Sequence, residues 1–177
     1  MSPTTNAGRR AHPVEVVVVI VNYRTAPLTI ASLRALAPEI AACPGVTAVV
    51  VENASGDDSS ARIRSAITEA GWSWVRLIES ERNGGYAAGN NLAIRPRLDG
   101  AVGPDYFLLL NPDTEVRPGA VTALVDFMEQ HPAVGVAGSC LLNPDGVAWA
   151  TAFRFPSVLG ELESGVRLGP VTRLLDR

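Results

Sequence analysis

The stretch VEVVVVIV, residues 14–21, which is followed at once by the polar residues NYRT, decides the fold. Apart from Glu15, every residue in it is a valine or an isoleucine. A short β-branched run without polar–apolar alternation is typical of a strand that is buried on both faces of a sheet. The glutamate interrupts the run, and polar residues stand where a signal peptide would have its cleavage site. We therefore interpret residues 14–21 as a buried strand that follows a loose tail at residues 1–13.

Similar apolar runs recur along the chain, at residues 46–52, 74–79 and 106–110, and more weakly at 133–138. Helix-like stretches separate them, at residues 26–42, 57–71, 85–96 and 118–132. This alternation predicts an α/β fold with a doubly wound, mostly parallel sheet and helices on both faces. Ligands bind such sheets outside the carboxyl ends of the strands, and the polar sequences of this chain gather at those ends.

Composition narrows the choice of partners. The 177 residues are 47% hydrophobic and 19% charged, with a net charge of -3. That balance is typical of a globular domain. Because there is no basic surplus to neutralise phosphates, we expect no nucleic acid partner. The longest apolar run is too short for a transmembrane segment.

Glu52 ends the second predicted strand, in VVVENASGDDSS. A carboxylate at that edge could accept hydrogen bonds from a nucleobase imide or a ribose hydroxyl. The alternative for its neighbours Asn53, Ser55 and Asp57 is that they only form a turn and cap the next helix.

The glycine-rich stretch NGGYAAGNN, residues 83–91, follows the third predicted strand. Its spacing matches neither the G-x-G-x-x-G fingerprint nor a P-loop, which disfavours a dinucleotide-dependent oxidoreductase. We expect instead a loop and a helix start that face a diphosphate or a sugar. Asn90 and Asn91 are unfavourable inside a helix, which indicates side-chain hydrogen bonds.

The tripeptide Asn-Pro-Asp occurs twice, at residues 111–113 and 143–145. The second copy is followed by Gly146 and is predicted to be a β-turn that closes a hairpin. The first copy ends the most apolar strand, where the carboxylate of Asp113 would suit a hard divalent cation together with diphosphate oxygens.

Taken in order, VVVVIVNYRT, VVVENASGDDS, ERNGGYAAGNN and YFLLLNPDTEV resemble the family 2 glycosyltransferases of GT-A fold. The likeness is greatest to rhamnosyltransferase-like members that build cell-surface polysaccharide. It implies a nucleotide-diphospho-sugar transferase-like domain at residues 14–156. Residues 157–177 would then begin a loosely ordered acceptor-side segment.

The resemblance also implies site residues. Asn22 and Tyr23 would line the nucleobase pocket, and Glu52 stands where the family more often has an aspartate that bonds the base. Asp113 matches the last carboxylate of the family's Asp-x-Asp motif, which makes it the ligand of Mg²⁺ or Mn²⁺. The other nucleotide-sugar-binding residues implied are Asn53, Asn83, Gly85, Gly89, Asn90 and Asn111. No role follows for Arg24.

The activity implied is inverting transfer of a sugar from a dTDP- or UDP-linked donor to a saccharide or lipid-linked acceptor. We expect it in the cytoplasm, with the inner face of the membrane as a peripheral location. The family's catalytic base lies in an acidic segment well after the metal motif, and neither Glu161 nor Glu163 matches it. The chain is therefore expected to be the donor-binding part of an enzyme, truncated at the C-terminus. The alternative is a non-catalytic nucleotide-binding module.

Overall fold

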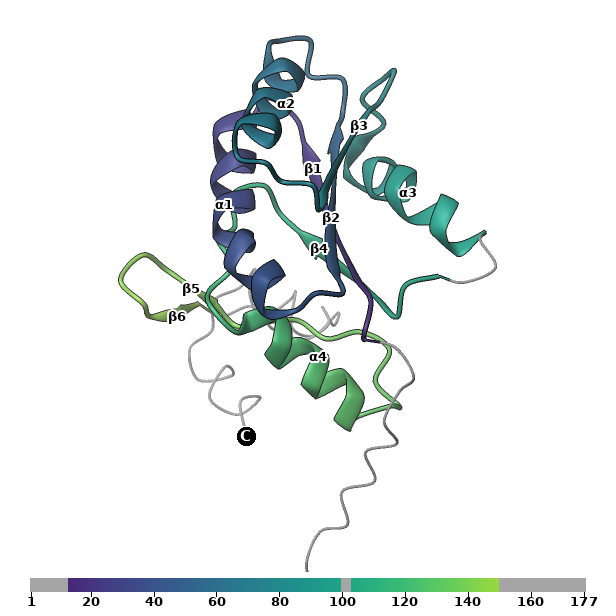
Figure 1. Ribbon diagram of the computed structural model, residues 1–177, viewed down its shortest axis with the longest axis vertical. Helices are drawn as coiled ribbons and strands as arrows, with labels where there is room; N and C mark the ends of the chain where they lie inside the picture. Colours follow the sequence, from purple (N-terminus) through teal and green to yellow (C-terminus); the bar gives the residue numbers. More distant parts are fainter. Residues whose placement is uncertain (1–12, 100–102, 150–177) are drawn as a thin grey trace, which may run out of the picture. The chain divides into compact units, whose positions relative to one another are not determined.

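The computed structural model describes residues 13–99 and 103–149 (Figure 1). The chain divides into two compact units, Met1–Gly135 and Val136–Arg177. The first unit holds the predicted sheet and its helices, and the second holds a short hairpin.

Four strands form the sheet of the first unit, and all of them are parallel. They are β1 (Val16–Asn22), β2 (Val46–Glu52), β3 (Val75–Glu79) and β4 (Tyr106–Leu110), in the order β3-β2-β1-β4. Every residue of β1 is buried, as expected of a valine-rich strand at the centre of a sheet. The predicted parallel α/β fold is thus confirmed.

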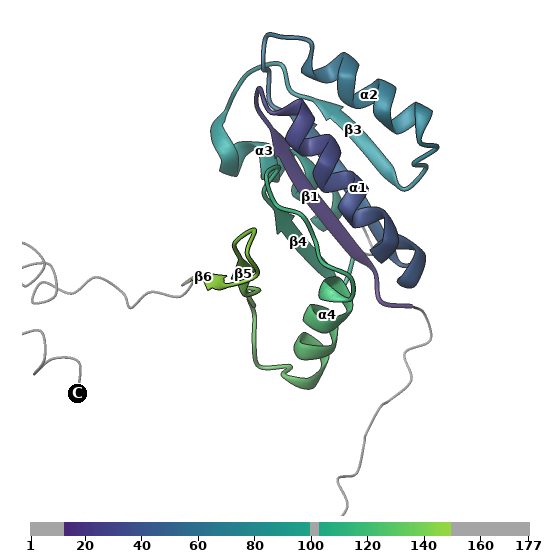
Figure 2. The same cartoon turned by 90° about the vertical axis from the view of Figure 1, so that its left-hand side faces the viewer.

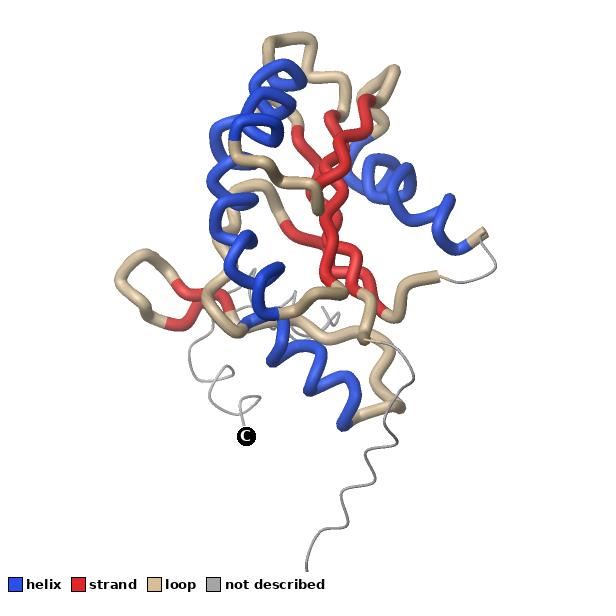
Figure 3. Tube along the Cα trace, in the orientation of Figure 1, coloured by secondary structure: helices blue, strands red, loops and turns tan. Residues whose placement is uncertain are grey.

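The helices cover both faces of this sheet (Figures 1 and 3). They are α1 (Ala26–Ala42), α2 (Ser59–Glu69), α3 (Gly85–Leu98) and α4 (Ala120–Gln130). One buried cluster joins alternate residues of β1 and β2 to α1, α2 and α4, and a second joins the intervening residues to α3. Alternation of side chains across the strands therefore builds two cores, one on each face. In residues 13–99 and 103–149, every helix is too short or too polar to span a bilayer.

Helix boundaries differ from the sequence prediction in three helices, at the end of α3 and at both ends of α2 and α4. The helix α3 continues past Pro96 to Leu98, because a proline removes only one backbone donor close to the end of a helix. The helix α4 starts at Ala120, since Gly119 has the left-handed φ of 81° and lies outside it. The helix α2 starts at Ser59, whose backbone N–H donates to Asp57 Oδ1 at 2.9 Å.

The second unit contains the predicted hairpin. Its strands β5 (Leu141–Leu142) and β6 (Ala148–Trp149) are antiparallel. At the turn, the N–H of Gly146 donates to the carbonyl of Asn143, and Gly146 has a φ of 79° that favours glycine. The weaker strand predicted at residues 133–138 is wrong. The structure has no strand there, and the side chain of Val136 is almost fully exposed.

Candidate functional site

The carboxyl ends of the four strands meet at one edge of the sheet. Asn22 is paired in register with Glu52, and Glu52 with Glu79, so β1, β2 and β3 end level. The last residue of β4, Leu110, pairs with Ile20 of β1, and β4 lies directly beside β1 (Figure 2). The strand order reverses between β1 and β4. Open α/β sheets bind ligands in the crevice outside such a reversal.

Ser55 connects the loops that follow β1 and β2. Its hydroxyl donates to Glu52 Oε1 and accepts from Asn22 Nδ2 at 3.3 Å and from the Arg24 backbone N–H at 2.9 Å. The side chain is buried, and all of its hydrogen-bonding capacity is used within the protein. From the sequence, Ser55 is expected only to form a turn and to help cap the next helix. No local signal could have found this role, because two of its partners lie 31 and 33 positions away.

Glu52 is only 6% exposed, and both of its carboxylate oxygens hold the turn that follows β2. They accept from the backbone N–H groups of Ala54 at 3.1 Å and Ser55 at 2.9 Å, in addition to the Ser55 hydroxyl. A buried carboxylate is tolerated when it is hydrogen-bonded in this way. Since a carboxylate offers about four acceptor positions, a further donor from a ligand could still bind it.

Asn22 lies beneath the edge of the sheet instead of lining it. The side chain is 0% exposed, and its Oδ1 accepts from the hydroxyls of Thr25 at 3.2 Å and Thr29 at 2.9 Å. With Nδ2 bonded to Ser55, the amide ties β1 to the first turn of α1 and to the loop after β2. The expected direct contact with a nucleobase is therefore not available in this structure, and Asn22 supports the residues above it.

Tyr23 and Arg24 form the exposed part of the loop after β1. The guanidinium carbon of Arg24 lies 5.2 Å from the centroid of the Tyr23 ring, and the Arg24 Nε donates to the carbonyl of Ser55 at 2.9 Å. Arg24 and Ala54 have φ angles of 58° and 55°, which are strained for residues other than glycine. Each residue held in such a conformation costs about 1–3 kcal/mol, which the surrounding structure has to offset. Residues of this kind are commonest at functional sites.

The structure brings three of the predicted binding residues together beside β2. Asn53 Nδ2 donates to Asn83 Oδ1 at 2.9 Å and to the carbonyl of Gly85 at 3.3 Å. Asn83 Oδ1 also accepts from the Gly85 N–H at 2.9 Å, which holds the entry to α3. Asn53 is buried, whereas Asn83 and Gly85 are exposed. The exposed surface of this group therefore comes from the glycine-rich loop.

Gly89 and Asn90 do not belong to that exposed loop, contrary to the sequence prediction. Both are buried within α3, where the helix packs against the sheet. A Cβ atom on Gly89 would lie 2.8 Å from Val21 Cγ1, so this glycine permits close approach of the helix to β1. Asn90 Nδ2 donates to the carbonyl of Tyr86 at 3.0 Å, one helical turn earlier. Packing explains the position of Gly89, whereas the buried Oδ1 of Asn90 has no hydrogen-bond partner among the described residues.

We expect Gly89→Ala to lower the free energy of unfolding by about 1 kcal/mol. Helix propensity alone would raise it by about 1 kcal/mol, but overpacking against the stiff side chain of Val21 costs about 1–3 kcal/mol. Urea unfolding measures the net change. As a control, Gly135→Ala places its methyl group in open space and should change stability by less than about 0.5 kcal/mol. A more stable Gly89→Ala variant would contradict the close packing of α3 on β1.

Asn111 and Asp113 follow β4, and both are exposed. The N–H of Thr114 donates to the carbonyl of Asn111 at 3.1 Å, so the tripeptide forms a turn at the end of the strand. In the part of the chain that the structure describes, no protein group pairs with the Asp113 carboxylate. Nor do those residues contain a group of three or more His, Cys, Asp and Glu side chains that could hold a metal ion. One free carboxylate fits a hard divalent cation whose other ligands come from a bound diphosphate and water.

The other Asn-Pro-Asp copy has a structural role. Asn143 accepts two hydrogen bonds in its own turn, from the N–H of Gly146 to its carbonyl and from the N–H of Val147 to its Oδ1, each at 2.9 Å. Asp145 lies exposed at the tip of the hairpin. The two copies therefore share a sequence but not a structural setting, as predicted.

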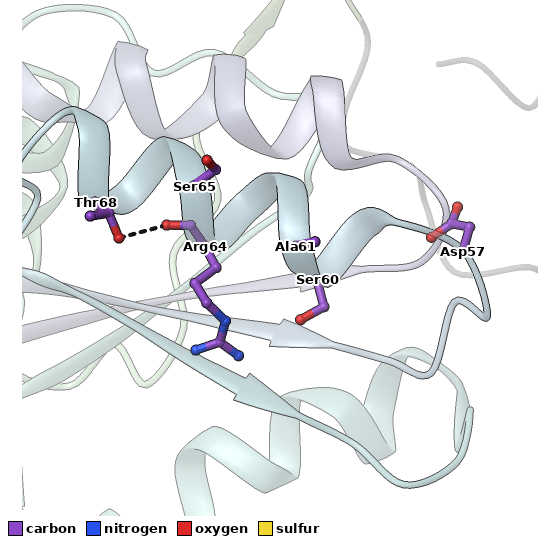
Figure 4. Close-up of a pocket in the computed structure, with 6 residues that line it drawn as sticks. All are labelled: Asp57, Ser60, Ala61, Arg64, Ser65 and Thr68. Carbon is purple, nitrogen blue, oxygen red and sulfur yellow. Dashed lines mark hydrogen bonds between the residues drawn. The ribbon is translucent and has the colours of Figure 1, made fainter.

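An open groove runs along α2 and is lined by Asp57, Ser60, Ala61, Arg64, Ser65 and Thr68 (Figure 4). Two of these lining residues, Arg64 and Ser60, donate hydrogen bonds to the carboxylate of Glu79 on β3. The Ser60 hydroxyl and Arg64 hold the pKa of Glu79 below its ordinary value. The ionised Glu79 carboxylate therefore contributes to the free energy of unfolding at neutral pH. That contribution is lost as the pH falls through the folded-state pKa of Glu79. None of the predicted nucleotide-binding residues lines the groove.

Comparison with known proteins agrees with the sequence resemblance. The family model described as "Glycosyl transferase family 2" matches residues 16–164. Over 91 residues the chain is 31% identical to the N-acetylglucosaminyl-diphospho-decaprenol L-rhamnosyltransferase of Mycobacterium tuberculosis. That match takes in 48% of this chain and 30% of the relative, so the matched part spans less than a third of the curated protein.

Solved structures share the fold at low sequence identity. The mannosyltransferase PcManGT from Pyrobaculum calidifontis, in complex with GDP-Man and Mn²⁺, has a TM-score of 0.59 at 22% identity. The alignment covers 76% of this chain and 37% of that protein. S. aureus TarS 1-349 in complex with UDP-GlcNAc has a TM-score of 0.52 at 19% identity, covering 67% of this chain and 32% of that one.

Proposed function

Because this chain belongs to glycosyl transferase family 2, we propose that it binds the nucleotide-sugar donor of an inverting glycosyltransferase. One observation carries the proposal. The exposed residues Tyr23 and Asp113 follow β1 and β4, the neighbouring strands between which the strand order reverses. An aromatic ring and an exposed carboxylate thus open onto the same edge of the sheet, which suits a ligand with a base at one end and a diphosphate at the other.

On the base side, the proposal assigns contact to the ring of Tyr23, which is 41% exposed. Asn22 and Ser55 hold this loop from below, and Glu52 holds the facing turn. Ribose and diphosphate would then lie toward the loop of Asn83 and Gly85. The bonds among these residues fix both loops before any ligand arrives, which lowers the entropy lost on binding.

On the diphosphate side, Asp113 would hold Mg²⁺ or Mn²⁺, with Asn111 beside it. A bound divalent cation supplies charge stabilisation to a leaving diphosphate. The solved mannosyltransferase is described with Mn²⁺ and GDP-Man, which supports a metal of this kind without choosing between the two. The protein's own part is to hold the carboxylate at the rim of the sheet, where the diphosphate can approach it.

In the reaction proposed for the whole enzyme, an acceptor hydroxyl attacks the anomeric carbon and the bond to the diphosphate breaks. The nucleoside diphosphate leaves, and the hydroxyl proton passes to a general base. Glu161 and Glu163 lie outside the described residues, and we assign the base to neither. The relative named for transfer to a decaprenol-linked diphosphate sugar supports a lipid-linked or saccharide acceptor.

Titration calorimetry of the full chain with UDP and with dTDP tests the proposal. Each is measured with Mn²⁺, with Mg²⁺ and with EDTA, and NAD⁺ serves as the control ligand. We expect binding of at least one nucleoside diphosphate that is strengthened by metal, and no binding of NAD⁺. Absence of diphosphate binding under all conditions would overturn the proposal.

An assay of sugar transfer distinguishes an active glycosyltransferase from a non-catalytic donor-binding module. If the chain binds a metal–diphosphate complex and transfers sugar from a UDP- or dTDP-linked donor, it is active as it stands. If it binds but does not transfer, it acts as a donor-binding module that needs further residues to supply the base.

A further inference from the structure

A buried carboxylate that the proposed reaction does not use caps α4 from a distant helix. Glu39, near the end of α1, is only 2% exposed. Its Oε1 accepts from the N–H of Gly119 at 2.6 Å and its Oε2 from the N–H of Val121 at 2.9 Å. The first N–H groups of a helix lack partners within it and carry partial positive charge, so a carboxylate there is stabilised. The N-cap residue of α4 makes no side-chain cap of its own.

This contact holds one end of the loop that carries Asp113. Residues 111–119 connect β4 to α4 without regular secondary structure. The other end is held by the pairing of Leu110 with Ile20 of β1. Between these points the N–H of Thr114 donates to the carbonyl of Asn111 and that of Ala120 to the carbonyl of Arg117, and the partly buried side chain of Val116 packs against the core. The position of Asp113 therefore depends on the end of β4 and on the two anchors that follow it, the side chain of Val116 and the start of α4.

The same helix borders the base side of the site. The helix α1 starts directly after the loop of Tyr23 and Arg24, and its first turn is tied to Asn22 through Thr29. Close to its other end, Glu39 holds the start of α4. The helix α1 thus connects the loop after β1 with the loop after β4.

We propose that Glu39 is a positioning residue for the metal-binding carboxylate of Asp113, an inference that rests on the proposed function. By fixing the start of α4, it restricts the loop and reduces the entropy lost when Asp113, a divalent cation and a nucleoside diphosphate come together. Glu39 itself touches neither the metal nor the nucleotide.

The proposal differs from a purely structural role for Glu39. Val121 is buried in the core, and the side chains of Cys43 and Thr122 also lie 3.1 Å apart between α1 and α4. These contacts keep α4 on α1 when Glu39 is replaced. A change at Glu39 should therefore loosen the Asp113 loop while the pocket around Tyr23 stays intact.

The test compares Glu39→Gln and Glu39→Ala with wild type in the full chain. Asp126→Asn is the matched control, since Asp126 is an exposed carboxylate on α4 itself. Affinity for UDP is measured with Mn²⁺ and with EDTA, and amide hydrogen exchange is measured over residues 111–121. We expect Glu39→Ala to weaken UDP binding about tenfold with Mn²⁺ and not at all with EDTA. Glu39→Gln keeps one acceptor and should fall between Glu39→Ala and wild type.

Hydrogen exchange provides the second, ligand-free measurement. Amides of the Asp113 loop should exchange faster in Glu39→Ala than in wild type. In Asp126→Asn their exchange rates should equal those of wild type. Equal affinity and equal exchange in all variants would overturn the inference, as would equal losses of affinity with Mn²⁺ and with EDTA. A wild-type chain that binds neither UDP nor dTDP under any of these conditions would instead overturn the proposed function, and the exchange data would still decide whether Glu39 orders the loop.

Discussion

Asp113→Ala is expected to remove the metal-dependent part of nucleoside diphosphate affinity. The exposed carboxylate is the only protein ligand that the proposal gives to the cation, and a bridging metal contributes several kcal/mol to holding a diphosphate. We expect affinity for UDP in Mn²⁺ to fall by about 100-fold, which is about 2.7 kcal/mol. Affinity in EDTA should not change. Titration calorimetry under both conditions measures the difference.

The second Asn-Pro-Asp copy provides a matched control for this experiment. Asp145→Ala removes the same side chain from the same tripeptide, but at an exposed hairpin tip. It should leave UDP binding unchanged and alter stability by less than about 0.5 kcal/mol. Asp113→Ala should also keep its stability, because the side chain that it removes is exposed. If both variants lose the same affinity, the separation of the two copies is wrong.

Glu52→Ala should lower the free energy of unfolding by about 3 kcal/mol and disorder the base side of the site. The change leaves the N–H groups of Ala54 and Ser55 and the Ser55 hydroxyl without their acceptor. Loss of one partner of a buried hydrogen bond costs about 1–3 kcal/mol, and more when the partner is charged. The strained φ of Ala54 also loses the bonds that enforce it. Urea unfolding measures the change in stability.

Glu79→Ala is the control for Glu52, since the two residues are paired in register at the same edge of the sheet. Glu79 is exposed, and its ion pair with Arg64 faces solvent, so its removal should cost less than about 1 kcal/mol. Near-equal losses from the two changes would show that the turn after β2 does not depend on Glu52. Metal-free UDP affinity should fall in Glu52→Ala and stay unchanged in Glu79→Ala.

Much of the fold follows from local sequence. The four apolar runs are strands, as predicted. For the central strands β1 and β2 the reason is that a strand covered on both faces must be apolar, and consecutive residues show this, whereas the edge strands β3 and β4 are only partly buried. The hairpin at residues 143–146 follows from proline and glycine at defined turn positions. The strand predicted from the weak apolar run at residues 133–138 was wrong, because small apolar residues alone do not distinguish a strand from a loop.

The candidate site was less predictable. Position after a strand was enough to place Tyr23 and Asp113 at the carboxyl edge of the sheet. It was not enough to tell exposed residues from buried ones at that edge. Asn22 and Gly89 belong to motifs that the resemblance assigns to the nucleotide, yet one is hydrogen-bonded beneath the edge and the other packs against Val21.

By itself, the sequence determined the class of fold, the strand ends at which polar residues gather, and the family to which the chain belongs. Only the tertiary structure decided that Ser55 joins the loops after β1 and β2 and that Glu39 caps a helix about 80 positions away. The physical reason is the separation along the chain over which each kind of interaction acts. Strand, helix and turn preferences act between near neighbours in the chain, whereas these hydrogen bonds form only after the order β3-β2-β1-β4 has brought distant residues together.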